Sequence, residues 1–444
     1  MLPDGSENEV LTSSSLNSRN IILNRPKALN SLNPSMVQKI SEYIKKFEDS
    51  DLCNNIIIKS TSPRAYCAGG DVVSIAKGVK EKTPGMSAFF RDEYTLNHAL
   101  ATVKKPVVAI MSGVTMGGGV GISVHAPFRV ASENTLLAMP ETLIGFFTDV
   151  GASFYLPRLD GEIGTYLGLT GYRLKGKDAF YAGFATHYVP LERIPLLEAR
   201  LNELPTKSHD SVNAAIEEFV EESDGTFDFS LAPYMNAINR CFKYDTVEEI
   251  MDALNKETEH PEWAKTTIDT LNTMSPTSLK VTLELLRRGK KMQIQECFQM
   301  ESYLAAQIIL GPDFYEGISE LLIKKTKNPK WNPSAITDIP LQQVIERFFD
   351  LKDPEATIQF SNEQNYFEYP FRKYGLPTAN DIRDFISGSD LSSSEVVFTA
   401  DEIVGIFENK YNFKVGVKEK IQFILKTNTI ESSNKDFKSV IWKS

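Results

Sequence analysis

The first third of the chain alternates short apolar segments with a longer segment of helical periodicity. Residues 21–23, 56–58 and 106–110 are apolar runs typical of buried strands. Between the first two runs, from Pro34 to Asp49, apolar side chains recur on one stripe and predict an amphipathic helix. Because parallel strands need a crossover between them, this alternation predicts an α/β core with largely parallel strands.

After about residue 190 the strand signal fades and amphipathic helices follow, including a block from Pro276 to Leu322. Glutamates between Glu217 and Glu222 are most simply the solvated acidic face of one such helix. The segment 340–444 is helical and aromatic-rich, with linker-like serines between residues 387 and 394. We therefore expect an α/β core over 1–190, a helical part of the same domain over 191–335, and a helical C-terminal extension over 336–444.

Composition disfavours several classes of protein. The formal net charge of −10 argues against general nucleic-acid binding, because phosphates would repel the chain, but not against docking onto proteins of a larger particle. Four cysteines and five histidines show no CxxC, HxH or HxxxH spacing, so we expect no metal site and no disulfide framework. No apolar run approaches the ~18 residues of a membrane span. The acidic, serine-rich first twenty residues do not resemble an organellar presequence.

Two glycine-rich turns follow predicted strands. The first, in residues 64–71, centres on Gly70, and the second, in residues 116–121, centres on Gly118 and opens a predicted helix. Small residues let a substrate approach backbone N–H groups closely, and amides at a helix N-terminus suit an oxyanion. Either turn alone is also consistent with a tight connection or close helix packing. Neither turn is GxGxxG and no GK[ST] follows, so nucleotide binding fits poorly.

Residues 139–151 add two carboxylates near these turns. Together with the segment 24–30, the two turns and this acidic segment resemble the crotonase (enoyl-CoA hydratase/isomerase) superfamily over residues 18–335. Within it the chain resembles the 3-hydroxyisobutyryl-CoA hydrolases, through ordered matches at 68–71, 91–94, 115–121, 138–141, 149–151, 156–159, 169–171, 185–188, 275–280 and 313–317.

That resemblance implies a ββα-superhelix core followed by a helical region, and hydrolysis of a thioester in valine breakdown. It also implies a mitochondrial location. Coenzyme A would be part of the substrate, and no separate cofactor is expected. The oxyanion would be held by the backbone N–H groups of Gly70 and Gly118, each of which typically stabilises a transition state by about 3–4 kcal/mol.

The resemblance also implies roles for side chains. Glu141 is the candidate base or nucleophile on the thioester carbonyl, and Asp149 the candidate contact to the acyl hydroxyl or handler of its proton. The residues expected to bind substrate are Glu93, Gly118, Glu141 and Asp149, and those expected to bind CoA are Arg25, Lys27, Arg64 and Ala68. Structural alternatives remain open: Glu141 as a helix-start carboxylate, Glu93 as a surface residue, and the three cations as ordinary surface charges.

Two positions depart from a pattern within the superfamily. Hydratases use a second glutamate just after the triple glycine, whereas this chain has Gly121, which favours hydrolysis over hydration. The hydrolases usually have proline before the Asp149 position, whereas this chain has Thr148, so the loop lacks the ring that would stiffen it. We expect His125 and His187 to be structural. Cys67 is expected to be packed rather than nucleophilic.

The C-terminal extension resembles that of fungal hydrolase-like proteins, which are also components of the mitochondrial ribosomal small subunit. Its aromatic segment 366–371 suits either a surface that docks onto proteins or a tail that packs on its own core. Three functions therefore stay open: hydrolysis of 3-hydroxyisobutyryl-CoA, a structural role in that ribosomal subunit on a retained enzyme scaffold, and another acyl-CoA hydrolase or isomerase activity. No sequence-specific nucleic-acid binding is expected.

Overall fold

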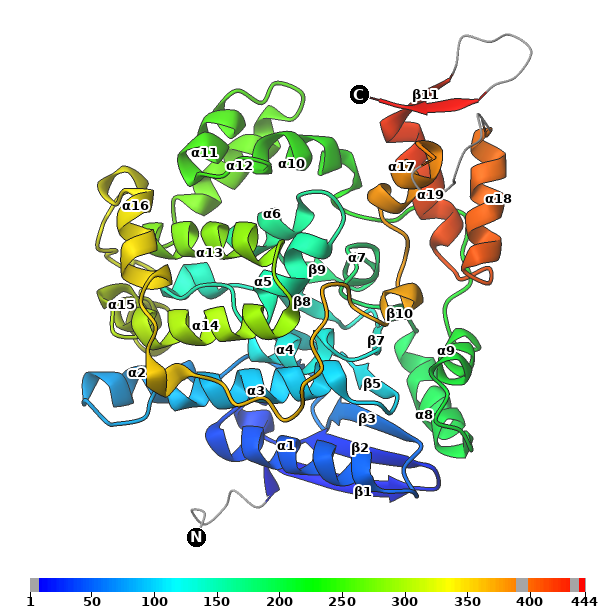
Figure 1. Cartoon of the computed structure of the whole chain (residues 1–444), viewed down its shortest axis with the longest axis horizontal. Helices are drawn as coiled ribbons and strands as arrows, with labels where there is room; N and C mark the ends of the chain where they lie inside the picture. Colours follow the sequence, from blue (N-terminus) through cyan, green and yellow to red (C-terminus); the bar gives the residue numbers. More distant parts are fainter. Residues whose placement is uncertain (1–7, 389–397, 432–438, 444) are drawn as a thin grey trace.

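The structure is a computed structural model that describes residues 8–388, 398–431 and 439–443. The start of the acidic N-terminus and most of the predicted serine linker lie outside these residues. The described chain forms two large sheets surrounded by helices, and a small two-stranded sheet near the C-terminus (Figure 1).

The larger sheet has six strands in the order β1-β2-β3-β5-β7-β10. Its first two strands form an antiparallel hairpin, and every later pair is parallel. The second sheet has the order β4-β6-β8-β9, with β4, β6 and β8 parallel and β9 antiparallel. The predicted, largely parallel α/β core is therefore confirmed. The strands are β1 (Val10–Ser15), β2 (Ser18–Leu23), β3 (Asn55–Ser60), β4 (Ala65–Cys67), β5 (Val107–Ile110), β6 (Val114–Met116), β7 (Phe128–Ala131), β8 (Leu136–Ala138), β9 (Leu174–Lys175), β10 (His187–Tyr188), β11 (Thr429–Glu431) and β12 (Val440–Trp442).

Helix α1 (Pro34–Asp49) crosses between β2 and β3, as the periodicity predicts. Its start is fixed locally, because the Asn33 side chain accepts a hydrogen bond from the N–H of Met36 and a proline occupies the first turn. The predicted stripe is buried in full: Met36, Val37, Ile40, Ile44 and Phe47. Apolar burial of this kind, about 25 cal/mol per Å2, holds the helix against the sheet.

Helices and no strands occupy residues 191–335, all of which the structure describes. The predicted helical block after Pro276 consists of α13 (Pro276–Gly289), α14 (Ile294–Ile308) and α15 (Pro312–Ile318), followed by a π-helical turn at Ser319–Ile323. The three-part division of the chain at residues 190 and 335 stays a prediction. The remaining helices are α2 (Val72–Lys80), α3 (Ala88–Thr102), α4 (Gly118–Val124), α5 (Ala152–Tyr155), α6 (Ile163–Thr170), α7 (Lys177–Tyr181), α8 (Ile194–Glu203), α9 (His209–Glu217), α10 (Met235–Phe242), α11 (Val247–Asn255), α12 (Pro261–Leu271), α16 (Leu341–Val344), α17 (Ala379–Ile386), α18 (Ala400–Lys410) and α19 (Val417–Asn428).

The C-terminal extension packs back on the core. Figure 1 shows it running from α16 across the front of α3 and α14 to α17, α18 and α19. The Tyr366 hydroxyl donates to the carbonyl oxygen of Ala101 at 3.1 Å, and the Tyr369 hydroxyl to that of His125 at 2.7 Å. Within the aromatic segment only Phe367 is a large exposed apolar side chain, at 45%. Of the two alternatives for these aromatics, packing on the core is the one the structure shows.

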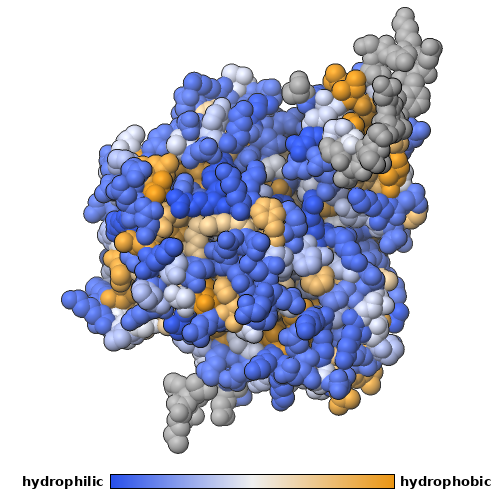
Figure 2. Space-filling model, in the orientation of Figure 1, coloured by the Kyte–Doolittle hydropathy of each residue, from blue (hydrophilic) through white to orange (hydrophobic). Residues whose placement is uncertain are grey.

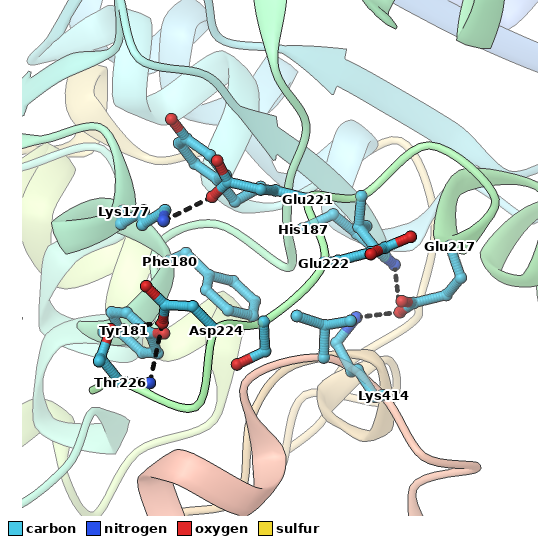
Figure 3. A pocket seen from close by; sticks show the side chains of 14 residues that line it. Lys177, Phe180, Tyr181, His187, Glu217, Glu221, Glu222, Asp224, Thr226 and Lys414 are labelled. Atoms are coloured by element: carbon cyan, nitrogen blue, oxygen red, sulfur yellow. Dashed lines mark hydrogen bonds and ion pairs between the residues drawn. The ribbon is translucent and has the colours of Figure 1, made fainter. Parts of the chain in front are cut away.

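A buried ion cluster joins the extension to α9 and β10 (Figure 3). Glu217 lies between the imidazole of His187, at 3.1 Å, and the ammonium group of Lys414. The prediction of a solvated acidic face is therefore wrong at Glu217, where α9 ends and the side chain is only 23% exposed. His187 is structural as expected: burial lowers its pKa to about 4. The adjacent Glu221 pairs with Lys177 at 2.5 Å.

Apolar side chains are scattered among polar ones on the face shown in Figure 2. No helix in the described part of the chain has both the length and the apolar character needed to span a membrane.

Candidate active site

Three parallel neighbours of the smaller sheet bring the predicted site residues to one edge. Gly70 follows β4, Gly118 follows β6, and Glu141 follows β8, so each comes directly after the carboxyl end of its strand. Carboxyl ends of adjacent parallel strands meet at the same edge, where α/β proteins commonly place their ligands. The sheet thus assembles residues that are far apart in the sequence.

The amides of Gly70 and Gly118 lie side by side and are free to bind a ligand. A Cβ placed on Gly118 would be 3.3 Å from the nitrogen of Gly70. Among the described residues, neither N–H group donates a hydrogen bond to another protein atom. The preceding Gly117 has φ +48° and ψ −120°, a backbone conformation that side chains with a Cβ rarely adopt. The turn at Gly117 leaves the N–H of Gly118, the first residue of α4, without a hydrogen-bond partner among the described residues.

Two carboxylates lie against this pair of amides. A Cβ on Gly117 would be 2.8 Å from an Oε of Glu141, and a Cβ on Gly118 would overlap an Oε of Glu93. Glu141 begins a short 3-10 turn, whereas Glu93 lies in the middle of α3. The structural alternative for Glu93 as a surface residue is wrong, because the side chain is only 2% exposed.

Burial makes these carboxyl groups weak acids. Glu93, Glu141 and Asp149 are 2%, 6% and 4% exposed. Burial raises the pKa of Glu93 and of Glu141 well above the ordinary range, and the nearby Asp149 charge raises both further. The Oε1 of Glu93 and the Oε2 of Glu141 have no hydrogen-bond partner among the described residues. Such oxygens are poised to bind a substrate or water that enters the site.

Asp149 is positioned by a residue that the sequence prediction did not single out. The hydroxyl of Tyr94 donates to an Oδ of Asp149 at 2.7 Å, and both groups are buried. Burial raises the pKa of Asp149 to about 7, although the hydrogen bond from Tyr94 opposes the shift. Tyr94 follows Glu93 directly in the sequence, so the matched segment 91–94 contained a signal for it.

A second unpredicted residue, Glu301 on α14, holds the turn that follows Asp149. Its carboxylate accepts hydrogen bonds from the N–H groups of Gly151, at 2.7 Å, and Ser153, at 2.9 Å. It is 0% exposed, and burial raises its pKa to about 8. No local pattern near residue 301 could have indicated a partner about 150 residues earlier.

Thr148 is fixed by hydrogen bonds at the position where the resemblance leads us to expect a proline. Its N–H donates to the hydroxyl of Thr282 at 3.2 Å, and its own hydroxyl donates to the carbonyl oxygen of Gly168 at 2.8 Å. A proline could form neither bond. The backbone before Asp149 is therefore tied to α13 and α6 even without the ring.

Gly121 leaves no room for the second glutamate of a hydratase. A Cβ there would be 2.7 Å from the Cβ of Val150 and 3.0 Å from the Oδ1 of Asn97. Both neighbours are fully buried, so neither can move aside freely. The sequence argument against hydration, which rested on a missing side chain, is thus supported by the packing around it.

We expect Gly121→Glu to lower stability without creating a hydratase. Overpacking a core costs about 1–3 kcal/mol, and an unpaired buried carboxylate adds to that cost. Thermal unfolding and an enoyl-CoA hydration assay check the two parts. Gly405→Glu is the matched control, because nothing lies within 4 Å of a Cβ at Gly405. Equal melting temperatures for the two variants would contradict the packing argument.

The predicted CoA-binding residues are only partly gathered at the site. Arg25 lies at the first turn, where it pairs with Asp71 at 2.9 Å and with Glu9 at 3.2 Å. Lys27 and Arg64 are exposed, and the N–H of Ala68 is occupied by the carbonyl oxygen of Leu29. Contact of these four with CoA stays a prediction.

The remaining candidates for chemistry at the site are inert. Cys67 is fully buried, and burial raises its pKa to about 12, which keeps it a thiol. His125 is buried with a pKa lowered to about 4, and its Nε2 lies 2.8 Å from the carbonyl oxygen of Val150. Across the described ranges, no group of three or more histidine, cysteine or acidic side chains could hold a metal ion.

We expect Asp149→Asn to stabilise the free protein at alkaline pH. The folded-state pKa of Asp149 is raised from 3.8 to about 7, so the native state binds the extra proton between these values. Wild-type stability therefore falls as the pH rises from about 4 to about 7, by an amount on the order of a few kcal/mol. The asparagine side chain of the variant cannot ionise, so the variant avoids this loss of stability at pH 8 and has no advantage over the wild type below about pH 4. Urea unfolding at both pH values checks this; an Asn variant less stable than wild type at pH 8 would contradict it.

Comparisons with known proteins agree with this geometry. The family profile described as enoyl-CoA hydratase/isomerase matches residues 18–349. The small ribosomal subunit protein mS47 of Neurospora crassa is 40% identical over 461 residues, which cover 99% of this chain and 89% of that protein. The mitochondrial 3-hydroxyisobutyryl-CoA hydrolases of Xenopus laevis and Homo sapiens are 45% and 43% identical. Each alignment covers 74% of this chain, and 84% and 86% of the respective relative.

Two solved structures share the fold. A carnitinyl-CoA dehydratase from Mycobacterium thermoresistibile superposes with a TM-score of 0.73 at 34% identity, over 80% of this chain and 100% of that one. An enoyl-CoA hydratase from Rhodobacter sphaeroides gives a TM-score of 0.70 at 32% identity, over 79% of this chain and 100% of that one. The predicted fold class is confirmed by these similarities.

Proposed function

Because the chain belongs to the enoyl-CoA hydratase/isomerase family, or crotonase superfamily, we propose that it hydrolyses the thioester of 3-hydroxyisobutyryl-CoA. The products are 3-hydroxyisobutyrate and CoA, in valine catabolism. The observation that supports this reaction most is the pair of unpaired amides at Gly70 and Gly118 with a buried glutamate, Glu141, against them. The named hydrolase relatives at 43–45% identity support the substrate. They are mitochondrial by name, and we place this chain in the mitochondrion as well.

In the proposed mechanism the thioester carbonyl oxygen sits between the N–H groups of Gly70 and Gly118. These amides stabilise the negative charge that develops on the oxygen when the carbonyl carbon is attacked. Glu141 removes the proton from an attacking water or attacks the carbon itself. In the first route the carbon–sulfur bond then breaks, the acid is released, and the leaving thiolate of CoA takes the proton from Glu141. In the second route the carbon–sulfur bond breaks to leave a mixed anhydride on Glu141 and the thiolate takes a proton from solvent. Water then hydrolyses this anhydride, which releases the acid and restores the carboxylate. Asp149, held by Tyr94, contacts the hydroxyl group of the acyl chain.

Differences in packing favour hydrolysis over the other reactions of the family. The second glutamate expected of a hydratase would stand at Gly121, where Val150 and Asn97 fill the space. Burial raises the pKa of Glu141, so its carboxylate is a stronger base than an exposed one.

The test is release of free thiol from a panel of short acyl-CoA esters. We expect the highest kcat/KM for 3-hydroxyisobutyryl-CoA and a lower value for isobutyryl-CoA, which lacks the hydroxyl that Asp149 would contact. The absence of thiol release from every ester would overturn the proposal. Equal rates for both esters would indicate a general acyl-CoA thioesterase instead.

A second function, which does not exclude the first, is a structural role in the small subunit of the mitochondrial ribosome. The ribosomal protein mS47 aligns with 99% of this chain, and so includes the extension, whereas the hydrolases align with 74%. Sedimentation of the tagged full-length chain with small subunits tests this role. An inactive but folded variant that co-sediments with the small subunits as the wild type does would separate the structural role from the enzymatic one. Absence of the wild-type protein from the small-subunit fractions would contradict the structural role.

A further inference from the structure

A cavity of about 110 Å3 lies where the extension meets the core. Its walls come from α4, β7 and the segment 154–160 on the core side, and from the segment 368–378 and α19 on the extension side. A single water needs only a small fraction of this space. The cavity is therefore large enough for a small organic molecule.

Two guanidinium groups at this cavity, those of Arg129 and Arg158, have no carboxylate partner in the described part of the chain. Arg129 is 7% exposed, and Arg158 is half-buried. Carbonyl dipoles offset part of the cost of burying such a cation but provide no compensating charge, so the site favours an anion. The acceptors are the backbone carbonyl oxygens of Phe184, Ala126 and Gly183 for Arg129, and of Phe367, Phe154, Gly289 and Met292 for Arg158.

The other charged side chains do not cancel this excess. Lys420 and Asp160, which both line the cavity, pair with each other at 3.3 Å. Arg372 also lines it and pairs at 2.6 Å with Asp381, which does not. The last lining acid, Glu368, is exposed and forms no ion pair with any described residue. With Arg372 and Lys420 paired, Arg129 and Arg158 face the single carboxylate of Glu368, so the cavity keeps an excess of one positive charge.

The rest of the wall includes apolar side chains from both sides. Val124, Phe154 and Leu159 contribute from the core, and Leu376 from the extension. Arg158 donates four of its five N–H groups to backbone carbonyls, so it offers a carboxylate its positive charge and one remaining N–H, and an apolar wall favours an apolar body. We propose that this cavity binds a small carboxylate with a compact apolar body, and that the bound molecule fastens the extension to the core. The inference does not depend on the proposed hydrolysis, although the acid which that reaction releases falls in the same chemical class.

One lining residue connects the cavity to the active site. His125 lines the cavity, and its ring lies 2.8 Å from the carbonyl oxygen of Val150, in the turn that holds Asp149. The backbone oxygen of His125 accepts the hydroxyl of Tyr369 from the extension at 2.7 Å. A molecule in the cavity would therefore touch His125, which contacts both the turn that holds Asp149 and the extension.

The experiment uses the full chain and three probes: isobutyrate, its uncharged isostere isobutyramide, and inorganic phosphate. We expect isobutyrate to raise the melting temperature saturably, and isobutyramide and phosphate to leave it unchanged. Arg158→Gln, checked for folding by circular dichroism, is expected to weaken isobutyrate binding in calorimetry by about 10- to 100-fold. Retention of wild-type affinity in that variant would overturn the role of the guanidinium.

Cavity-filling variants locate the site. Leu376→Trp fills it from the extension and Val124→Phe from the core, so a folding failure in one leaves the other as a test. Leu351→Trp is the matched control, because Leu351 lies in the extension and is 48% exposed. We expect the shift by isobutyrate to vanish in the folded filling variants and to persist in Leu351→Trp and in Glu141→Gln. A shift that persists in the filled variants, or an equal shift by isobutyramide or phosphate, would overturn the proposal.

Discussion

Replacing Glu141 by glutamine lowers kcat for thiol release from 3-hydroxyisobutyryl-CoA by about 10²- to 10⁴-fold. The amide has the shape of the carboxyl group but can neither accept a proton from water nor attack the thioester carbon. KM is expected to change less, because the amides of Gly70 and Gly118, which we propose hold the oxyanion, belong to the backbone and stay in place. The measurement is steady-state kinetics with detection of the free CoA thiol.

The fold of this variant is expected to survive. Glu141 is buried with a raised pKa, so the charge that glutamine removes contributes nothing favourable to folding at neutral pH. Glu192→Gln is the matched control, since Glu192 is exposed and far from the site in the sequence. A Glu141→Gln enzyme with wild-type kcat and a wild-type melting temperature would show that another group performs the proton transfer.

Removing residues 336–444 lowers the melting temperature of the remaining chain by about 10 °C or more, or leaves it insoluble. The extension contributes fully buried side chains, among them Val344 and Phe348, which are 0% and 2% exposed. Each such side chain stabilises by about 1.5–3 kcal/mol, and each kcal/mol corresponds to about 2–4 °C in a domain of 150–250 residues. Differential scanning fluorimetry of the purified fragment and of the full chain measures the difference.

Phe367→Ala in the full chain is the control for the truncation, because Phe367 is an exposed aromatic side chain of the extension. It is expected to melt within about 2 °C of wild type, since changes at exposed positions usually stay within about 0.5 kcal/mol. A truncated chain as stable as the full one would show that the extension is only an appendage. If the truncation unfolds as expected, its failure to sediment with ribosomal subunits would say nothing about docking.

Local sequence pattern was sufficient for part of the larger sheet, but not for the short strands β4, β6 and β8 that place the site. Helix α1 and strands β2, β3 and β5 were predicted because their apolar side chains follow the period of each structure. The resemblance to the crotonases placed Gly70, Gly118 and Glu141 together, and the parallel strands that precede them bring them to one sheet edge. Their catalytic roles stay predictions.

The contacts that fix Asp149 could not be predicted in the same way. Tyr94, Thr282 and Glu301 reach the turn around Asp149 from helices that lie far away in the sequence. Nothing in a local pattern encodes such pairings, because each depends on how whole helices pack. The aromatic segment 366–371 posed the same difficulty: its composition is alike whether the rings face a partner or their own core.

The path of the extension across α3 and α14 has a consequence for the order of synthesis. The surface that Tyr366 and Tyr369 later cover is complete once α14 ends at Ile308, but those tyrosines are still to be made. At about 5–20 residues per second, the intervening chain of about 60 residues takes roughly 3–12 seconds to synthesise. During that interval the surface of the core that these tyrosines cover has no cover from the extension.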